Sequence, residues 1–264
     1  MDLATIGGLI LAWVSLGLIV FIEGGGNFQA LVNPGAFILV VGGTLGATMV
    51  GLSLEDVMAI PSVLKKAFLA KRVQVGETIT MLVNLSRTVR KEGLLSLESV
   101  IETIEDDFFK KAIQIVVDGM DADQVRAILE TDLELLEERH KRGHKVFATM
   151  GGFGPTLGII GTVMGLVFML ANLSTPDTMG PAISAAFIAT LYGVSSANLL
   201  YLPIAAKLQR RGEEETLLRR IILEGILSIQ AGDNPRILEE KLLAFLPPRL
   251  RLQVSESLKG AAKK

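Results

Sequence analysis

The sequence contains no cysteine, which excludes disulfide bonds, thiolate metal sites and thiol catalysis. It also has little net charge, because 26 Lys and Arg residues stand against 28 Asp and Glu residues. No dense block of Lys and Arg breaks this balance, so nucleic acid is not an expected partner. Aromatic residues are scarce, at 5%, whereas half of the sequence is hydrophobic and 27 residues are glycine. This mixture is typical of closely packed membrane helices.

Four long stretches of the sequence contain no Asp, Glu, Lys or Arg. Each is long enough to cross a hydrocarbon core of about 30 Å, which requires roughly 20 apolar residues in a helix. The first stretch is not expected to be a signal peptide, because it follows an aspartate and lacks a clear cleavage site. The predicted spans are Leu3–Ile22, Pro34–Leu54, Ala148–Leu170 and Pro181–Ala206.

The basic residues predict the orientation of these spans. The short loops Glu23–Asn33 and Ala171–Gly180 contain no Lys or Arg, and all 26 basic residues lie between Ser53 and Phe147 or from Lys207 onward. Because Lys and Arg flank spans on the cytoplasmic side, both termini are expected in the cytoplasm. We therefore predict an all-α integral membrane protein with four transmembrane helices and a helical cytoplasmic domain. The expected segments are two helix pairs, 1–54 and 148–206, and the cytoplasmic helical segments 55–147 and 207–264.

The charged segments carry helical patterns with recognisable ends. Apolar residues recur at helical spacing from Val75 to Gly93, and glycine is a common helix stop. A second helix follows Asp106 and ends near Gly119. A third begins at an aspartate cap and is expected to run directly into the third span. In the tail, the sequence GDNP and then Pro247 predict two further stops. We expect an all-α bundle from these patterns.

The third predicted span carries a glycine stripe and one hydroxyl. At 100° per residue the glycines fall within an arc of roughly 80°, with Thr162 at its edge. Such a stripe is typical of close packing in lipid, and it also fits a surface that faces another chain or an ion path. Pro155 leaves a backbone carbonyl without its helical donor, so this span offers two oxygen types that bind cations. The glycines are Gly151, Gly154, Gly158, Gly161 and Gly165.

The fourth predicted span repeats this arrangement. Ala186, Thr190, Gly193 and Ala197 line one side of it, and Pro203 lies near its inner end. Proteins that couple work to ions usually carry a carboxylate or a basic group inside the membrane. The four predicted spans contain no such group. If this chain conducts ions, a partner must therefore supply the carboxylate.

The soluble segments offer exposed charges but no catalytic set. Arg90 and Glu98 flank the break at Gly93. Such charges are ordinarily solvated surface, and they also suit fast, reversible binding to a partner of complementary charge. His140 and His144 share a helix face, yet no acidic residue lies on the right turn to complete a metal site. We predict no metal, no cofactor and no enzyme activity.

Three stretches, together with the four-span layout, resemble one family over nearly the whole chain. They are GPTLGIIGTVMGL, FIATLYG with Pro203 downstream, and RKEGLLSLE, and they resemble the flagellar stator subunits of the MotA and PomA type. The resemblance implies a subunit of the bacterial inner membrane that conducts Na⁺ or H⁺ and converts ion flow into torque. It implies a homopentamer around a dimer of a MotB/PomB-type subunit, whose single span contains the ion-carrying Asp. It also implies contact with the rotor protein FliG.

The same resemblance suggests roles for individual residues. Arg90 and Glu98 match the rotor-facing charges of the family, and Pro155 and Pro203 match the prolines linked to conformational coupling.

The two threonines bear on the identity of the ion. Thr190 matches a threonine that is widely shared in the family, and Thr162 matches one that is typical of sodium-type members. Asn33 departs from the sodium-type pattern, which has an acidic residue at about this position. A sodium ion must exchange its hydration water for oxygen ligands, whereas a proton can move through water alone. The two hydroxyls therefore favour sodium over the proton.

Two other classes of protein compete with this interpretation. An energising subunit of the ExbB/TolQ type typically has three spans and its main cytoplasmic loop after the first, whereas here the loop follows the second. A secondary transporter would show intramembrane charge or inverted repeats, and the sequence has neither. A passive membrane scaffold is the remaining alternative, and measurement of ion flux with and without a partner distinguishes it.

Overall fold

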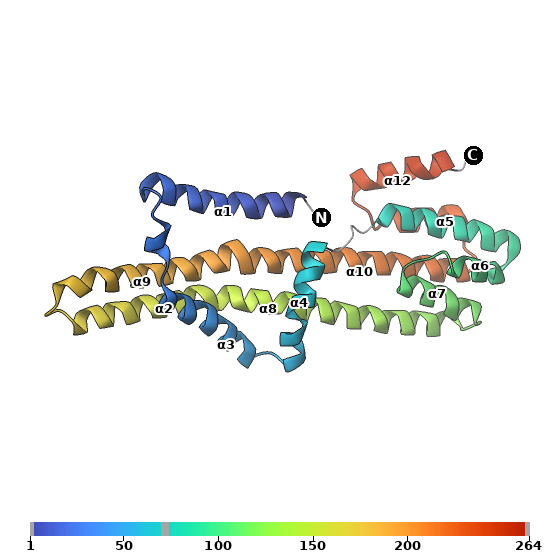
Figure 1. The fold of residues 1–264 in the computed structure, drawn as a ribbon. Coiled ribbons are helices and arrows are strands. Elements are labelled where there is room, and N and C mark those ends of the chain that lie inside the picture. The colour runs from blue at the N-terminus through green and yellow to red at the C-terminus, as the bar shows by residue number, and fades with distance from the viewer. Residues whose placement is uncertain (1–2, 70–73, 262–264) are drawn as a thin grey trace. The chain divides into compact units, whose positions relative to one another are not determined.

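The computed structural model describes residues 3–69 and 74–261, and every regular element within those ranges is a helix (Figure 1). The predicted all-α class is therefore confirmed. The predicted segments 1–54, 55–147 and 207–264 each include a few residues that lie outside the described ones. The chain divides into two compact units. Unit 1 comprises Met1–Lys71 and His140–Arg210, and unit 2 comprises Arg72–Arg139 and Arg211–Lys264.

Unit 1 contains all four stretches predicted to cross the membrane. The helices α8 (Ala122–Ala171) and α10 (Leu202–Gln230) contribute to both units. Within unit 1, α8 and the following α9 run antiparallel around a short turn (Figure 1). The remaining elements of unit 1 are α1 (Leu3–Glu23), η1 (Phe28–Leu31), α2 (Pro34–Phe37), η2 (Ile38–Gly42), α3 (Gly43–Val50), α4 (Leu54–Leu69), α9 (Pro176–Ser196) and η4 (Ala197–Tyr201).

Three helices of the described residues are long and apolar enough to span a membrane. They are α1, α8 and the continuous helix formed by α9, η4 and α10. A fourth span results if Pro34–Val50 is counted together with the next helix, from which it is bent by 119°. The helix α8 has 50 residues, which is about 75 Å at 1.5 Å per residue and far exceeds a core of about 30 Å. As expected, the helix that starts at the aspartate cap continues without a break through the third apolar stretch.

The second apolar stretch ends as a helix at Val50, earlier than the predicted limit at Leu54. A new helix begins after Ser53, whose side chain caps it. The Ser53 hydroxyl oxygen accepts the N–H of Asp56 at 3.2 Å, and the Asp56 carboxylate accepts the N–H of Ser53 at 3.2 Å. This reciprocal capping box is a strong helix start, so α4 begins at this point.

The short helix α4 belongs to unit 1 although the sequence assigns it to the cytoplasmic segment 55–147. Ile60, Val63 and Leu64 of α4 pack against a buried cluster that contains Val146 and Phe147 of α8. The predicted segments follow an expected membrane boundary, whereas the compact units follow side-chain packing. The two divisions therefore differ around α4 without excluding one another.

The outer faces of unit 1 expose large apolar side chains. Phe21 is 68% exposed and Ile22 is 74% exposed on α1, and Val167 and Phe168 of α8 are also exposed. A protein in water rarely leaves such contiguous apolar surface uncovered. A bilayer covers it without cost, because the backbone polar groups of a helix are already paired internally. Unit 1 is therefore suited to lipid.

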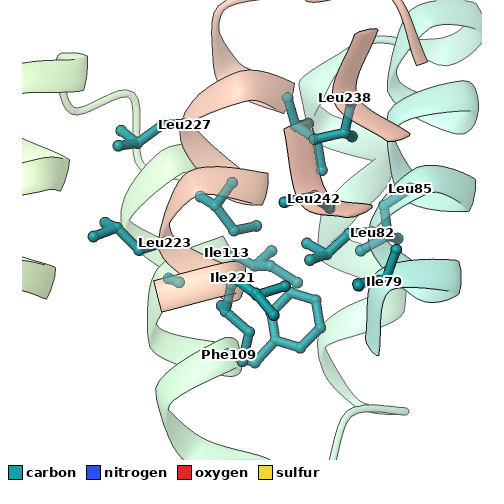
Figure 2. Close-up of a cluster of buried hydrophobic side chains, with 14 of the residues drawn as sticks. Ile79, Leu82, Leu85, Phe109, Ile113, Ile221, Leu223, Leu227, Leu238 and Leu242 are labelled. Atoms are coloured by element: carbon teal, nitrogen blue, oxygen red, sulfur yellow. The ribbon is translucent and has the colours of Figure 1, made fainter. Parts of the chain in front are cut away.

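Unit 2 has a continuous hydrophobic core, unlike unit 1. Figure 2 shows side chains from α5, α7, α10 and α11 that meet in this core. Leu82 of α5 and Ile221 of α10 are fully buried there. A Cβ atom on Gly225 would lie 2.7 Å from Leu82 Cδ1, so this glycine allows α10 and α5 to approach closely. The elements of unit 2 are α5 (Val75–Glu92), η3 (Leu94–Leu97), α6 (Glu98–Ile101), α7 (Asp107–Val117), α11 (Pro235–Leu243), α12 (Pro248–Ala261) and the parts of α8 and α10 within it.

The predicted helix ends in unit 2 are confirmed. Gly93, Gly119 and Gly232 have φ angles of 85°, 80° and 74°, a region that side chains other than glycine rarely adopt. Asp121 accepts the N–H of Gln124 at 2.9 Å and caps α8 as expected.

Ionic contacts join the helices of unit 2 at its surface. Arg220 of α10 contacts Glu137 of α8 at 2.8 Å, and Lys241 of α11 contacts Asp233 at 2.6 Å. The Lys241 ammonium group, and then the Ser228 hydroxyl, hold the pKa of Asp233 below its usual value. These contacts are partly exposed and contribute little stability, on the order of 0 to 1 kcal/mol each. The buried core determines the fold of this unit.

Candidate functional site

The glycine stripe of α8 packs against α9 of the same chain. A Cβ atom on Gly158 would lie 2.9 Å from the carbonyl oxygen of Ala189, and one on Gly154 would lie 3.1 Å from that of Gly193. All five glycines of the stripe are buried. The packing interpretation is therefore correct, and the idea that these glycines face another chain is wrong, because helices of the same chain cover them.

Thr162 and Thr190 meet where α8 and α9 come together. The Thr162 hydroxyl lies 3.0 Å from the carbonyl oxygen of Ala186 and 3.1 Å from that of Gly158, and it is hydrogen-bonded to the Thr190 hydroxyl. We call these four oxygen atoms the oxygen cluster. The sequence places the two hydroxyls on neighbouring faces, and the structure brings them into direct contact. Both side chains are half-buried.

Two carbonyl oxygens in the oxygen cluster come from main chain that is already helical. A hydroxyl has one proton, so Thr162 satisfies one acceptor at a time while further oxygen lone pairs point to the same place. Oxygen atoms of hydroxyl and carbonyl groups are the ligands that alkali cations use when they leave water. The cluster can therefore contribute part of a cation coordination shell and needs further ligands to complete it.

Pro155 lies inside α8 and is half-buried. Because it has no N–H, the carbonyl of Gly151 lacks its helical donor. That carbonyl lies three turns before Thr162, or about 16 Å along the helix axis. The structure therefore does not bring the freed carbonyl next to the Thr162 hydroxyl, and Pro155 acts on the helix rather than on the oxygen cluster.

Pro203 lies one residue into α10, directly after the π-helical turn η4. In that turn the N–H of Leu202 donates to the carbonyl of Ala197, five residues earlier. The π-helix is rare, occurs mostly as single turns inside α-helices, and is frequent at functional sites. Pro203 is exposed, so its ring is available to a neighbouring molecule.

The segment Arg90–Glu98, which we call the knuckle, forms an exposed corner of unit 2. Arg90 lies in the last turn of α5, and Glu98 begins α6; both are exposed. Between them, Gly93 turns the chain into the 3₁₀ helix η3. The fully buried Leu97 holds this corner to the core, whereas Leu95 is 71% exposed. The knuckle thus presents an apolar side chain between two opposite charges.

Leu95 was missed by the sequence analysis, although the sequence contains a signal for it. A 3₁₀ helix has three residues per turn, so Leu94 and Leu97 share a face. Both pack on or into the core of unit 2. Leu95 falls between them and faces outward, where its apolar side chain lies close to the charged groups of the knuckle in the sequence.

Asn33 has a structural role at the outer end of the second apolar stretch. Its side-chain oxygen accepts the N–H of Ala36 at 2.9 Å and caps α2. Tyr192 of α9, another residue that the sequence analysis missed, donates its hydroxyl proton to the carbonyl of Leu31 and accepts the N–H of Asn33 at 3.3 Å. An aspartate would cap the same helix equally well, so the departure at Asn33 keeps the local fold.

The fold and these sites define a class of protein, a helical membrane protein with a hydroxyl-bearing helix pair and a second helical unit that has its own hydrophobic core. Within the described residues no group of His, Cys, Asp and Glu side chains is arranged to hold a metal ion. Two protein-family models match the chain. The model of the MotA/TolQ/ExbB proton channel family matches residues 100–221, and the model of the Motility protein A N-terminal region matches residues 5–93.

Known proteins resemble the chain over almost its full length. It is 37% identical to Motility protein A of Bacillus subtilis, over 97% of this chain and 95% of that protein. It is 38% identical to Chemotaxis protein PomA of Vibrio alginolyticus, over 93% and 96%. The solved structure of C. jejuni MotAB matches with a TM-score of 0.87 and 34% identity, covering 94% of this chain and 97% of that one. The flagellar MotAB stator complex from Bacillus subtilis matches with a TM-score of 0.86 and 36% identity.

This chain belongs to the MotA/TolQ/ExbB proton channel family. It is a membrane protein, and its family consists of channel subunits and not of enzymes.

Proposed function

We infer that this chain is a flagellar stator subunit that forms an ion channel with a MotB-type partner. The agreement with the two MotAB structures, which extends over 94% of this chain, carries this inference. The curated relatives that match along more than 90% of the chain include proteins named for motility and chemotaxis. This favours a stator over the ExbB/TolQ type of energising subunit and over a passive scaffold.

The membrane topology of this subunit is the next part of the proposal. We propose four spans in the bacterial inner membrane, with both termini in the cytoplasm. The second span is Pro34–Val50, the segment that is bent relative to the next helix. The absence of Lys and Arg from Glu23–Asn33 and Ala171–Gly180 supports this orientation.

Because the sequence has no cysteine, an introduced cysteine is a unique label for topology. We expect a membrane-impermeant maleimide to label Asn27→Cys and Ser174→Cys in spheroplasts with an intact inner membrane. Thr103→Cys should react only after that membrane is opened, because the proposal places unit 2 inside. All three residues are exposed, so accessibility of the side chain itself does not limit labelling. Labelling of Thr103→Cys across an intact membrane contradicts the orientation.

The proposed ion path combines the oxygen cluster with a group from the partner. We propose that five copies of this chain form a homopentamer around a MotB/PomB-type dimer, and that the single span of this partner supplies the ion-carrying Asp. Thr162 and Thr190 then offer oxygen ligands along the route, and we propose sodium as the ion. One cation that crosses at 100 mV releases about 2.3 kcal/mol. This energy suits rotation of a rigid ring and is far too small for refolding.

Pro155 and Pro203 are proposed to couple ion passage to movement. Each removes a helical hydrogen bond in α8 or at the start of α10, which weakens resistance to bending at that point. Bending at Pro155 would change the direction of α8, which carries the glycine stripe. Bending at Pro203 would change the direction of α10, which continues from α9 through η4.

The knuckle is proposed to contact the rotor protein FliG. Arg90 and Glu98 provide complementary charge for encounter, and the exposed Leu95 provides an apolar anchor between them. Charged rims set specificity and association rate, whereas a central apolar side chain contributes much of the binding energy.

Charge reversal at the knuckle tests this contact. We expect Arg90→Glu and Glu98→Lys each to weaken rotor engagement by roughly tenfold and to impair swimming. Assembly in the membrane should not change, because exposed charges contribute about 0 to 1 kcal/mol to stability. The matched controls are Arg249→Glu and Glu134→Lys, which reverse exposed charges elsewhere on unit 2. Swimming speed and the amount of assembled complex are measured together, and loss of the complex in both knuckle variants contradicts the proposal.

A further inference from the structure

A cavity of about 410 Å³ lies within unit 1, between α1 and the helix formed by η4 and α10. Its wall on α1 includes Gly8, Leu9 and Ala12, and its opposite wall includes Leu199 and Ile204. Gly8 and Ala12 lie one helical turn apart, so two small residues face the cavity from the same side of α1. A Cβ atom on Gly8 would have no protein atom within 4 Å. The small residues on α1 leave this space open.

The cavity has an apolar part and a cationic end. Along η4 and α10 it extends from Asn198 to Arg210, which is about 18 Å at 1.5 Å per residue. Lys207 and Arg210 line one end, three residues apart and on one helix face. The remaining lining is mostly apolar and includes Phe68 of α4. The length of 18 Å is close to the depth of one leaflet, since the whole hydrocarbon core is about 30 Å thick.

The dimensions limit what can occupy this space. The lining pairs a mostly apolar wall about 18 Å long with two basic residues at one end. A slender apolar chain with an anionic head matches both the apolar lining and the charge at its end, because basic pockets at the ends of membrane helices bind lipid headgroups.

We propose that this cavity binds one anionic phospholipid of the cytoplasmic leaflet. One acyl chain lies between α1 and α10, and the headgroup phosphate contacts Lys207 and Arg210. The inference rests on the orientation given under the proposed function, because only then do the two basic residues lie at the inner surface. Pro203 also lines this cavity, so the lipid would contact the first turn of α10 where the π-turn ends. The bound lipid would thereby contact Pro203, which is proposed to couple ion passage to movement.

Native mass spectrometry of the full-length complex tests this proposal. The purified complex is titrated with phosphatidylglycerol and, separately, with phosphatidylcholine that has the same acyl chains. We expect the anionic lipid to bind more tightly. The Lys207→Gln/Arg210→Gln double variant should lose about thirtyfold of its affinity for phosphatidylglycerol, at about 1 kcal/mol for each charge removed. Its affinity for phosphatidylcholine should not change. The matched control is Lys141→Gln/Lys145→Gln, which removes two exposed charges from α8 outside the cavity.

A second pair of variants tests the apolar part of the cavity. Gly8→Leu fills the space and should remove binding of both lipids, whereas Gly7→Leu, which adds the same side chain beside it, should not. Neither glycine would place a Cβ atom near another protein atom, so both variants are expected to fold. Equal affinity of the parent for the two lipids, or equal loss in the two double Gln variants, overturns the proposal. Dissociation of the complex in Gly8→Leu with unchanged lipid binding shows instead that a neighbouring chain fills the cavity.

This test does not depend on motility. If the lipid pattern appears in a complex that produces no torque, the stator function fails and the lipid site stands. If the complex produces torque and the lipid pattern is absent, the lipid site fails alone. Labelling at Thr103→Cys checks the orientation separately.

Discussion

Gly158→Ala is expected to force α8 and α9 apart and to abolish motility. The new methyl group would lie 2.9 Å from the carbonyl oxygen of Ala189 and 3.2 Å from the Cα atom of Thr190. Both are backbone atoms, so no side-chain rotation can relieve the contact. Inserting a group into a packed interior typically costs about 1 to 3 kcal/mol. Here the displacement would also disturb the oxygen cluster, because Thr162 contacts the Gly158 carbonyl.

The matched control for this change is Gly152→Ala on the same helix. A Cβ atom on Gly152 would have no protein atom within 4 Å. The two substitutions therefore add the same methyl group to the same helix and differ in what it meets. The amount of folded chain in the membrane and the swimming speed are measured for both. Equal behaviour of the two variants would contradict the close α8–α9 contact.

Thr162→Ala is expected to remove the dependence of motility on sodium. The substitution deletes the hydroxyl that contacts Thr190 and the Ala186 carbonyl, so the oxygen cluster loses its central member. Swimming speed is measured across external sodium at fixed pH and membrane potential. We expect the parent to swim faster as sodium rises, and we expect the variant to require at least about tenfold more sodium or to stop, since one lost ligand contact is worth about 1.4 kcal/mol or more.

Thr162→Ser is the control, because it keeps the hydroxyl and removes a methyl group. It should retain the sodium response of the parent. A parent whose speed is independent of sodium refutes sodium as the ion. A response that is lost equally in the Ser and Ala variants shows that the methyl group, and thus packing, is the property that matters.

Much of the helical architecture follows from local rules that are visible in the sequence. The ends at Gly93 and Gly119 are predictable because positive φ angles favour glycine, and the start of α8 is predictable from an aspartate cap. The end at Val50 was missed because hydropathy reports apolar length and not direction. The capping pair Ser53 and Asp56 was present in the sequence and could have indicated the break.

The candidate sites were predictable in part, for a different physical reason. Helical periodicity identifies which residues share a face, and so the glycine stripe and Thr162 could be recognised. It does not identify what covers that face, and only the structure shows that α9 of the same chain does so. The contact between Thr162 and Thr190 depends on the relative register of two helices, which periodicity within each helix leaves open. The exposure of Leu95 depends on the 3₁₀ helix η3, which has three residues per turn. A search for a 3.6-residue period does not identify the outward face of such a helix.

The α8–α9 contact also limits how this sequence can change during evolution. Where a side chain opposes a glycine, a smaller neighbour can compensate for a larger substitution, as Ala189 could become glycine opposite Gly161. Gly158 has no such neighbour, because the three atoms nearest to its absent Cβ belong to the backbone of α9. No second mutation can shorten a backbone. A lineage that loses Gly158 can therefore recover the close approach only by reversion, whereas Gly161 retains a route through a compensating change.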